Sequence, residues 1–300
     1  MVGVSFLGNN AMYAQLSYED ATPVIEQIGH LPVTQVPANI ESLADPELGS
    51  EVNRVFRAIS ERLSPPDQHF RIAIPSEWLH CYLLTVDSTL ETAEKRSFLD
   101  WESSQRLGTF ASRFTARYYP LGERDESEEV LAILFPGDLP EVFLEAARSA
   151  RVTVQSLEPD IFVSWNNVPK SFGTRYLIKF TDQTISVSQY KAQRFLGTGL
   201  FRYSRRKGLI QYLRGSVDNS RAKAFQTTLK GLLKGEPPKQ APVWIYGNPL
   251  PRQIRMLSQS DDHYRLVSPI SGWEAAVRSG EGPDRLTECQ YAEAIGITRI

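Results

Sequence analysis

Residues that commonly take part in catalysis occur in this chain, but their spacing does not define an active site. The four histidines are scattered, and none has a partner or a spacing that marks a catalytic pair; they are His30, His69, His80 and His263. Glu128 and Glu129 are adjacent carboxylates, but they lie in a charge-rich stretch where we expect them to be solvated. A general acid–base pair, which needs two groups positioned around one substrate, is therefore not indicated.

The usual phosphate-binding and zinc-binding motifs are also missing. The sequence has no Gly-x-x-x-x-Gly-Lys-Ser/Thr loop, no Gly-x-Ser-x-Gly elbow and no His-Glu-x-x-His helix. Gly197-Thr198-Gly199 lacks the third glycine of a dinucleotide fingerprint, which favours a simple turn. Cys81 and Cys289 are too few for a metal cluster or a disulfide framework, and this cysteine usage is typical of a reducing cytoplasm. We expect no metal site.

Length and composition indicate an ordinary globular protein. The chain has 300 residues, 41% of them hydrophobic, with 33 Lys and Arg against 35 Asp and Glu. This length predicts roughly two domains of about 150 residues, enough to bury a core without disulfides or metals. No apolar run approaches the ~18 residues of a membrane span, and the first residues lack the layout of a signal peptide. We therefore expect a cytoplasmic protein.

The near-neutral net charge hides an asymmetry along the sequence. Residues 1–200 carry 17 basic and 26 acidic side chains, whereas residues 201–300 carry 16 basic and 9 acidic ones. In residues 202–239, ten Lys and Arg face only Asp218 and Glu236. Such a stretch is either a solvated helical face or a contact for an acidic partner or an anionic membrane surface. No nucleic-acid partner is expected, because the sequence has no recognisable binding motif.

The elements that must position any site begin with strands. Residues 2–7 form an apolar run, Gly8-Asn9-Asn10 supplies a turn, and alternating residues follow, which predicts a hairpin extended by a third strand over residues 23–33. A helix is then predicted, followed by a strand over residues 70–75. The apolar face of that helix comprises Val52, Val55, Phe56, Ile59 and Leu63.

A small α+β insert is predicted to follow in the first half of the chain. Its expected elements are strands at residues 79–86, 117–121 (an edge strand, because of Pro120) and 130–135, a helix from Leu90 to Arg106, and an exposed hairpin loop over residues 123–129. Leu90, Ala93, Phe98 and Trp101 lie near one stripe of that helix, which favours a place for Phe98 and Trp101 in the core.

Beyond the insert, local signals predict a return to the first sheet. Asp138-Leu139-Pro140-Glu141 has the pattern of a helix start with Asp138 as N-cap and Glu141 as its reciprocal partner. A strand over residues 152–157 is expected next, and Glu158-Pro159 is expected to open a further helix.

The second half of the chain restarts with the pattern of the first. Residues 176–180 read as a strand, 181–183 as a turn, 184–189 as an alternating strand and 194–196 as a third strand. A helix-rich basic region follows, and Val243 to Tyr246 reads as a strand that enters the turn Gly247-Asn248-Pro249. The same strand–turn–strand–strand order thus begins twice, which indicates a weak internal repeat.

This repeated opening with an insert resembles the actin-like ATPase superfamily, and more narrowly its PilM/FtsA-type members, of which PilM-like proteins act in type IV pilus assembly. The segments that carry the resemblance are residues 2–16, Ile72-Ala73-Ile74-Pro75-Ser76, Phe98-Leu99-Asp100-Trp101-Glu102-Ser103-Ser104-Gln105, and residues 130–159. The resemblance implies an α/β, actin-like (RNase H-like) two-domain fold with an inserted α+β subdomain. The implied domains are 1–172 (core 1–76 and 152–172), the insert 77–151, and an abbreviated second domain, 173–300.

The sequence departs from this family where the family binds nucleotide. The resemblance places Ser5 where the first phosphate hairpin has an Asp, with Gly8 displaced by one position, and it places Lys179 and Thr181 at the Asp and Gly of the second hairpin. The glycine-rich adenosine turn is reduced to Gly247-Asn248-Pro249. The degenerate nucleotide-binding residues, if any function, are expected to be Ser5, Gly8, Asn9, Asn10, Lys179, Thr181, Gly247 and Asn248.

Lys179 permits two interpretations. Its ammonium can take the place of the carboxylate that holds a cation in the family, and so bind phosphate without metal. Alternatively, Lys179 extends to solvent or pairs with Asp182 across the turn. We expect a pseudo-ATPase with no catalytic residues, and ATP with Mg²⁺ stays open as a ligand.

The resemblance implies a scaffold that binds the cytoplasmic peptide of a bitopic inner-membrane pilus or secretion protein. The partner site is expected within residues 77–151 and their junction with the core, and the protein is expected to be peripheral to the inner membrane. One alternative is an active ATPase or small-molecule kinase of the same superfamily, for which Asp160 and Asp182 are the acidic residues near the expected cleft. A second alternative is a filament-forming FtsA-like protein, whose subunits stack head to tail.

Overall fold

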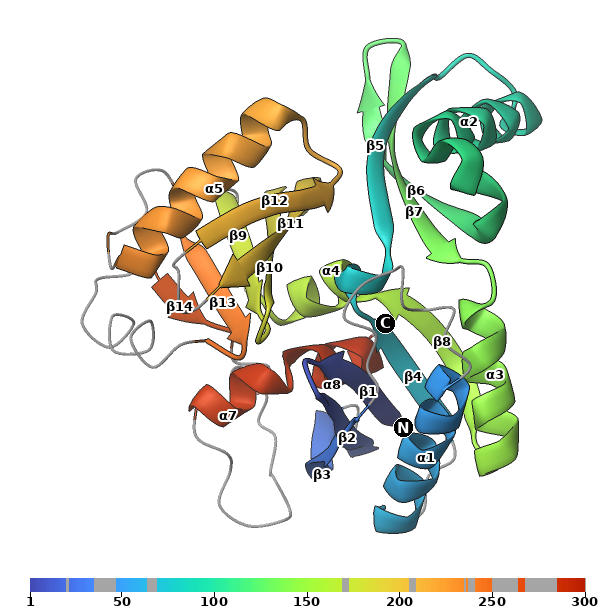
Figure 1. Ribbon diagram of the computed structural model, residues 1–300, viewed down its shortest axis with the longest axis vertical. Coiled ribbons are helices and arrows are strands. Elements are labelled where there is room, and N and C mark those ends of the chain that lie inside the picture. The colour runs from blue at the N-terminus through green and yellow to red at the C-terminus, as the bar shows by residue number, and fades with distance from the viewer. Residues whose placement is uncertain are drawn as a thin grey trace.

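The computed structural model contains three β-sheets and the helices that cover them (Figure 1). It describes residues 1–19, 22–34, 47–63, 69–168, 173–204, 209–234, 236, 241–249, 264–267 and 285–299. Two larger α/β halves lie beside each other, and the smallest sheet projects from the first half next to its own helix.

The sheet of the first half has the strand order β3-β2-β1-β4-β8. β1 is antiparallel to β2 and parallel to β4, so that a hairpin meander on one side continues into parallel strands on the other. α1 and α3 pack against each other and cover one face of this sheet (Figure 1). The bounds are β1 (Val2–Leu7), β2 (Asn10–Glu19), β3 (Thr22–Pro32), α1 (Glu47–Arg62), β4 (His69–Ile74), α3 (Leu139–Ala150) and β8 (Thr153–Pro159).

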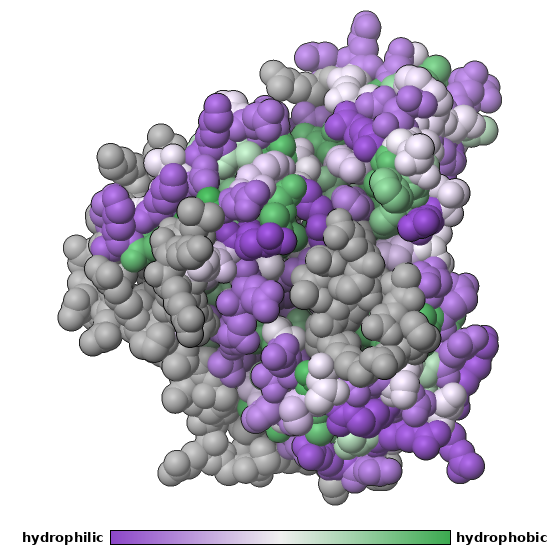
Figure 2. Space-filling view, viewed as in Figure 1, coloured by the Kyte–Doolittle hydropathy of each residue, from purple (hydrophilic) through white to green (hydrophobic). Residues whose placement is uncertain are grey.

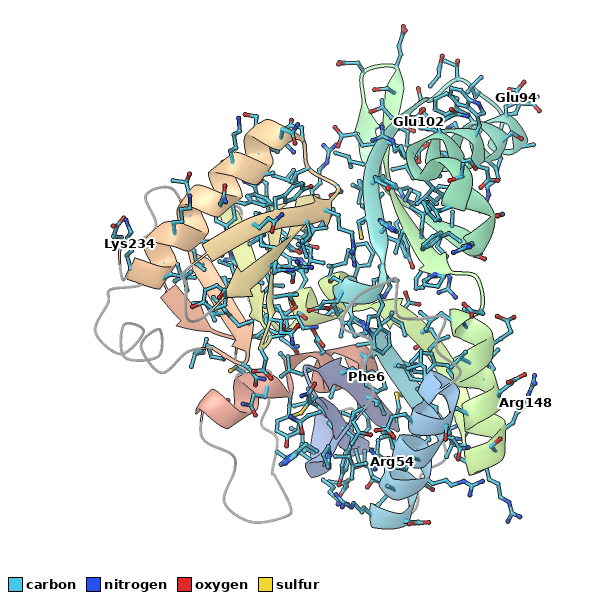
Figure 3. The ribbon with its side chains drawn as sticks, viewed as in Figure 1. Phe6, Arg54, Glu94, Glu102, Arg148 and Lys234 are labelled. Carbon is cyan, nitrogen blue, oxygen red and sulfur yellow. The ribbon has the colours of Figure 1, made fainter. Side chains whose placement is uncertain are left out.

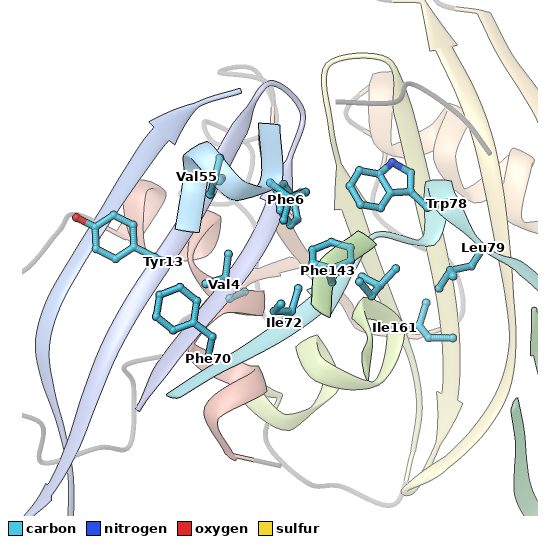
Figure 4. Packing of buried hydrophobic residues seen from close by; sticks show 14 of the residues in the cluster. Val4, Phe6, Tyr13, Val55, Phe70, Ile72, Trp78, Leu79, Phe143 and Ile161 are labelled. Atoms are coloured by element: carbon cyan, nitrogen blue, oxygen red, sulfur yellow. The ribbon is translucent and has the colours of Figure 1, made fainter. Parts of the chain in front are cut away.

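β1 is buried on both of its faces, because its side chains alternate between two layers. Val4 and Phe6 point into the core under α1 and α3, where the ring of Phe6 lies 5.4 Å from that of Trp78 (Figure 4). Gly3 points the other way, toward the short helix α8 (Ala292–Gly296). A Cβ at residue 3 would lie 1.8 Å from the carbonyl oxygen of Ala294, so only glycine lets α8 sit directly on the strand. The strand is thereby sandwiched between helices.

The face predicted for α1 is confirmed. Every residue expected on its apolar stripe is buried in the first-half core: Val52, Val55, Phe56, Ile59 and Leu63. This helix could be predicted because a 3.6-residue period is a local pattern that requires no knowledge of the packing partner.

The insert is a three-stranded antiparallel sheet of order β5-β7-β6 with one long helix. Alternate side chains of the central strand β7 point to opposite faces: Val130 and Leu134 contribute to the cluster with Leu99 of α2, whereas Ile133 and Phe135 join the first-half core. β6 lies at an edge, as Pro120 predicts. The bounds are β5 (His80–Asp87), α2 (Thr92–Leu107), β6 (Phe114–Arg124) and β7 (Ser127–Pro136).

The second half repeats the topology of the first. Its sheet has the order β12-β11-β10-β9-β13-β14, in which β11-β10-β9-β13-β14 corresponds to β3-β2-β1-β4-β8. The predicted internal repeat is therefore confirmed at the level of topology. α5 covers this sheet through Phe225, Leu229 and Leu232. The bounds are β9 (Thr174–Phe180), β10 (Thr184–Lys191), β11 (Arg194–Ser204), β12 (Leu209–Gly215), α5 (Asn219–Lys234), β13 (Val243–Gly247) and β14 (Tyr264–Leu266).

The chain passes between the halves twice. It leaves the first half through the short helix α4 (Asp160–Val163) after Glu158-Pro159, as predicted, and it returns through α7 (Arg285–Gln290) to α8 on the first-half sheet. None of the described helices is long and apolar enough to span a lipid bilayer.

Several local predictions differ from the structure in the extent of an element or in the contacts of its side chains. The loop expected over residues 123–129 is a tight turn at Asp125 and Glu126, and the strands run on to either side. Glu128 and Glu129 consequently lie in β7, where Lys95 and Arg194 pair with them at 3.1 and 2.8 Å. They are not freely solvated.

Three further boundaries differ from expectation. The N-cap Asp138 makes no side-chain hydrogen bond at the start of α3, so the reciprocal cap with Glu141 does not form, although Pro140 lies in the first turn as predicted. The third strand of the second half is not a short segment, because β11 extends to Ser204. The basic region predicted as helix-rich contains the strand β12 before α5.

The stripe predicted for α2 is also wrong. The buried residues of this helix are Leu99 and Ser103, whereas Phe98 and Trp101 are 36% and 56% exposed. Their rings lie 6.0 Å apart on the outer face. The boundaries proposed for the three domains remain predictions.

Candidate functional site

The turns of the two hairpins meet at the junction of the two halves. Gly8, in the first turn, has a φ of 57°, a left-handed conformation that favours glycine. A Cβ there would lie 3.1 Å from Oδ2 of Asp182 in the second turn and 3.9 Å from Nδ2 of Asn248 beyond β13. The three loops to which the resemblance assigns nucleotide binding therefore come together in space.

The cavity between these turns is small. It has a volume of about 90 Å³ and is lined by Phe6, Gly8, Asn9, Pro75, Glu77, Trp78, Thr181, Asp182, Gln183 and Thr184. Ligand pockets typically have volumes of about 300–1,000 Å³, and one water takes about 30 Å³ of liquid. The cavity that the described residues form here is thus smaller than a typical ligand pocket.

Of the predicted nucleotide-binding residues, only Gly8, Asn9 and Thr181 line this cavity. Ser5 lies in β1 with its hydroxyl buried and without a hydrogen-bond partner among the described residues, and Asn10 begins β2 opposite Leu7. Thr181 is engaged with its own turn, where its hydroxyl lies 2.8 Å from that of Thr184.

The turn predicted to hold adenosine is fixed by contacts within the protein. Gly247 has a φ of 86°, and a Cβ there would lie 2.3 Å from the carbonyl oxygen of Phe180. The Asn248 backbone N–H donates to the same oxygen at 2.7 Å, and its side chain accepts a hydrogen bond from Gln290 at 3.2 Å. This turn packs against β9 and α7.

The charged centre of the junction is the Lys179 cluster, which we define as Lys179, Glu77, Asp160 and Glu293. The side chain of Lys179 is 0% exposed. Its Nζ lies 2.7 Å from Oδ2 of Asp160, 2.8 Å from Oε1 of Glu293 and 3.9 Å from Oε2 of Glu77. An ammonium on the inner strand β9 is therefore surrounded by carboxyl groups from three other segments.

The acidic members of the cluster are themselves held in position. The Ser76 backbone N–H donates to Asp160 at 3.1 Å, and its hydroxyl also bonds this carboxylate. The Thr184 hydroxyl donates to Glu77 at 2.8 Å, which links the cluster to the small cavity. Ser76 follows the end of β4 and Thr184 begins β10, so both donors lie at ends of strands that face the cluster.

Burial and charge act against each other on the pKa values of this cluster. Burial alone would lower the pKa of Lys179, but the carboxyls of Asp160, Glu293 and Glu77 more than offset it, and the pKa lies well above its usual value. Burial raises the pKa of Glu293 to about 8, although Lys179 opposes this rise. Glu293 therefore keeps its proton to a higher pH than an unburied carboxyl does, even though Nζ of Lys179 lies 2.8 Å away.

The structure places Lys179 differently from the second interpretation, in which it extends to solvent or pairs with Asp182. It does not extend to solvent and does not pair with Asp182, since its described partners are Asp160, Glu293 and Glu77. Nor is it presented to the small cavity, which it does not line. Its charge is already satisfied within the protein, so the residues present do not fit a phosphate–lysine contact or a carboxylate-bound magnesium at this position.

The two acidic residues considered for catalysis lie in different settings. Asp160 is fully buried and bonded to Ser76 and Lys179, so it is not placed to accept a proton from a substrate hydroxyl. Asp182 lines the small cavity. Within the described part of the chain, no group of three or more His, Cys, Asp or Glu side chains is arranged to hold a metal ion.

A much larger groove, of about 990 Å³, separates the insert from β12 of the second half. We call it the insert groove. It lies where β12 approaches β5 in Figure 1, and the space-filling view shows apolar side chains exposed between the hydrophilic surfaces of the two lobes (Figure 2). Its lining residues are His80, Tyr82, Arg106, Leu107, Phe110, Ser112, Arg113, Phe114, Pro136, Gly137, Asp138, Leu213 and Arg214.

Arginines and aromatic rings dominate the chemistry of the insert groove. The guanidinium of Arg113 lies 5.6 Å from the ring centre of Phe110, and that of Arg106 lies 5.5 Å from the ring centre of Tyr82. Asp138 is the only acidic residue of the lining, against three arginines. The groove therefore offers positive charge and flat apolar surface together, which suits a ligand that carries both carboxylates and apolar groups.

The floor of the insert groove is fixed by contacts across the two halves. Arg214 of β12 donates to the carbonyl oxygen of Leu79 at 3.0 Å and also to that of Glu77. Burial lowers the pKa of His80 to about 4, with a further contribution from Arg214, so this imidazole is neutral at physiological pH. The groove is thus formed by segments whose relative position is set before a ligand binds.

Sequence reasoning missed Glu77, Glu293 and the residues of the insert groove. One signal could have identified Glu293: it is a single acid in the apolar run Tyr291 to Ile297, and an acidic residue in a fully buried segment needs a partner. The groove had no such signal, because Arg214 of β12 is about a hundred residues away in sequence from Phe110 and Arg113 on the insert.

No protein-family model and no curated protein matches the sequence. Solved structures do match. A chain of the PilM–PilN type IV pilus biogenesis complex matches with a TM-score of 0.75 over 99% of this chain and 97% of that chain, at 12% identity. The cytoplasmic domain of EpsL, an inner-membrane component of the type II secretion system of Vibrio cholerae, matches with a TM-score of 0.46 over 98% and 94% of the two chains, at 11% identity.

A third match is a protein of unknown function with an actin-like ATPase fold from Bacteroides thetaiotaomicron. It covers 89% of this chain and 90% of its own, with a TM-score of 0.46 and 10% identity. At such identities a match informs only on the fold, and of these three matches the first, with a TM-score of 0.75, defines it. Together with the repeated sheet order and the insert, it establishes that the chain has an actin-like two-domain α/β fold similar to that of the PilM–PilN complex chain.

Proposed function

We propose that this protein is a PilM-like scaffold of a type IV pilus or type II secretion-like machine. It binds the cytoplasmic peptide of a bitopic inner-membrane partner in the insert groove, does not hydrolyse ATP, and lies at the cytoplasmic face of the inner membrane. The observation that carries the proposal is the contrast between the insert groove, about 990 Å³, and the cavity between the hairpin turns, about 90 Å³.

The insert groove supports peptide binding by its size and chemistry. Its volume lies at the upper end of the range of about 300–1,000 Å³ for ligand sites. Phe110 and Phe114 offer surface for apolar anchors, while Arg113 offers a charged donor for a carboxylate. An extended peptide that alternates apolar and acidic side chains suits this lining, since affinity in such sites comes from a few buried anchors.

Two exposed aromatic residues allow a matched test of this site. Phe110 is 57% exposed and lines the insert groove, whereas Trp101 is 56% exposed and lies on the outer face of α2, outside it. We expect Phe110→Ala to weaken binding of a synthetic tail peptide, taken from the PilN-type protein of the same genome, by about tenfold or more. Trp101→Ala should leave the affinity unchanged. Fluorescence anisotropy with a labelled peptide measures both.

The contrary outcomes are distinct. Equal peptide affinity for the wild-type protein and Phe110→Ala would show that the peptide does not bind in the insert groove. An equal loss of affinity in Phe110→Ala and Trp101→Ala would indicate a general effect on the insert. Calorimetric titration with Mg²⁺-ATP is the companion measurement. Micromolar binding followed by turnover would restore the ATPase alternative and refute the non-hydrolysing scaffold.

The helix α5 supplies the second contact, with an anionic membrane surface. Lys223, Lys230 and Lys234 are exposed and lie seven and four positions apart, so that they form one stripe on the side away from the buried Phe225 and Leu229. No acidic residue occurs within α5. Figure 3 shows Lys234 at the outer end of this helix, away from the insert. Anionic headgroups attract such a stripe by about 1 kcal/mol per lysine.

A further inference from the structure

Lys179 lies where both passages of the chain between the two halves converge. Asp160 begins α4, on the outward passage, and Glu293 lies in α8, after the return. The ammonium on β9 is within 2.8 Å of a carboxyl oxygen from each. Glu77, from the turn after β4, contributes a third carboxyl at 3.9 Å. One positive charge therefore contacts both connections and the edge of the first-half sheet.

Two of the carboxyl oxygens around the Lys179 ammonium have no other hydrogen-bond partner among the described residues. Oε2 of Glu77 and Oε1 of Glu293 are buried, and the polar group that faces both of them is Nζ of Lys179, at 3.9 and 2.8 Å. Asp160 is fully buried and Glu293 is 3% exposed. Buried carboxyls without a cation would face a large desolvation cost. The arrangement is therefore that of a cation site whose cation is part of the chain.

We infer that Asp160, Glu293 and Glu77 form a binding site for a small organic cation, that the ammonium of Lys179 permanently occupies it, and that this ammonium holds the two halves together. A free alkylammonium ion binds the same oxygens when the side chain of Lys179 is cut back. The inference concerns the junction of the halves and does not depend on the insert groove or its peptide.

Two substitutions separate the charge of Lys179 from its volume. Lys179→Ala removes three carbons and the ammonium, a fragment equivalent to n-propylammonium. Lys179→Met also removes the charge but keeps most of the volume, so it leaves no space for an added cation. Both variants leave buried carboxyls unpaired, and we expect both to melt about 5 °C or more below the wild-type protein.

Added n-propylammonium chloride distinguishes the two variants. We expect it to raise the melting temperature of Lys179→Ala in a saturable manner, relative to sodium chloride at the same ionic strength. Lys179→Met and the wild-type protein should respond to both salts alike. If Lys179→Ala does not fold alone, recovery of folded protein on refolding with n-propylammonium is the equivalent result.

Three results would overturn the inference. The first is a melting temperature of Lys179→Ala equal to that of the wild type, and the second is an equal response of both variants to n-propylammonium. The third is failure of Lys179→Ala to refold or gain stability at any n-propylammonium concentration while Lys179→Met stays folded.

A measurement on the wild-type protein tests the occupied site directly. Reductive methylation of the folded protein, followed by mass spectrometry of its peptides, compares Lys179 with the exposed Lys223, Lys230 and Lys234. The three exposed lysines should be dimethylated while Lys179 stays unmodified until the protein unfolds. Modification of Lys179 at the rate of the exposed lysines would show that its ammonium is not held in a closed site.

Discussion

Single residues decide what the junction of the two halves can do. The ammonium of Lys179 contacts the carboxyls of Asp160 and Glu293 at this junction. The sequence indicates that Lys179 interrupts an apolar strand, but it cannot indicate the partners. Glu293 is separated from Lys179 by most of the second half, and nothing local in either segment specifies that they meet.

The raised pKa of Glu293 predicts how stability depends on pH. Asp160, Lys179, Glu77 and Tyr246 surround this carboxyl, and its pKa is about 8 in the folded protein against 4.5 for an unburied group. Between these values the folded state retains a proton that the unfolded state has released. The free energy of unfolding should therefore fall as the pH rises from about 4.5 to 8. Glu293→Gln removes this fall, and urea denaturation across that range measures it.

Glu51 provides the control for this measurement. Its hydrogen bond from Arg54 holds the pKa of Glu51 at about 2, so the stability that it contributes is lost only as the pH falls from about 4.5 toward 2. Glu51→Gln should keep the slope of the wild-type protein in the higher range. Parallel curves for the wild-type protein and Glu293→Gln would show that Glu293 is not the group responsible.

At the scale of elements, the sequence predicts best where a pattern is local. The hairpin turn at Gly8, the apolar face of α1 and the buried strand β7 follow from periodicity and turn chemistry alone. The helix α2 was predicted, but its buried stripe was wrong, because only the side that carries Leu99 and Ser103 is buried. Phe98 and Trp101 are exposed because the insert sheet lies on the other side of the helix, and the spacing of apolar residues along a helix does not predict where a sheet will lie.

The close packing of α8 against β1 can be tested with one substitution. In Gly3→Ala, the new methyl group would lie 1.8 Å from the carbonyl oxygen of Ala294. Since both atoms belong to the backbone framework, α8 must move, and we expect a loss of about 1–3 kcal/mol or more in the free energy of unfolding. Chemical denaturation of the purified variant measures this loss.

Gly173→Ala is the matched control, because a Cβ at residue 173 would have nothing within 4 Å. We expect it to change the free energy of unfolding by no more than about 0.5 kcal/mol. If Gly3→Ala were as stable as Gly173→Ala, α8 would not be seated on β1 as described.

At the scale of the whole molecule, acidic and basic side chains are concentrated in different parts of the chain. Residues 1–200 have a surplus of acidic side chains, whereas the described surface of α5 is basic. The sequence shows this asymmetry, and the spacing of Lys223, Lys230 and Lys234 puts them on one stripe of any helix that contains them. That this stripe faces outward depends on the packing of Phe225 and Leu229 against the sheet.

This surface predicts selective attraction to anionic membranes. We expect the protein to cosediment with vesicles that contain phosphatidylglycerol more than with pure phosphatidylcholine vesicles, and less as salt is raised. Changing Lys223, Lys230 and Lys234 together to Gln should reduce the partition coefficient on the order of a hundredfold, at about 1 kcal/mol per lysine. Changing the same residues to Arg should preserve it. Equal sedimentation of the Gln and Arg variants would exclude α5 as the contact.

The place of α8 also has a consequence for synthesis on the ribosome. The strands of the first-half sheet leave the exit tunnel long before Ala292–Gly296, because the whole second half is translated in between. Until that short helix arrives, the side of β1 that carries Gly3 and Leu7 lacks its cover. The nascent first half therefore presents an apolar face while residues 160–291 are added, at roughly 5–20 residues per second. A polypeptide released before α8 would keep that face open to chaperones and proteases.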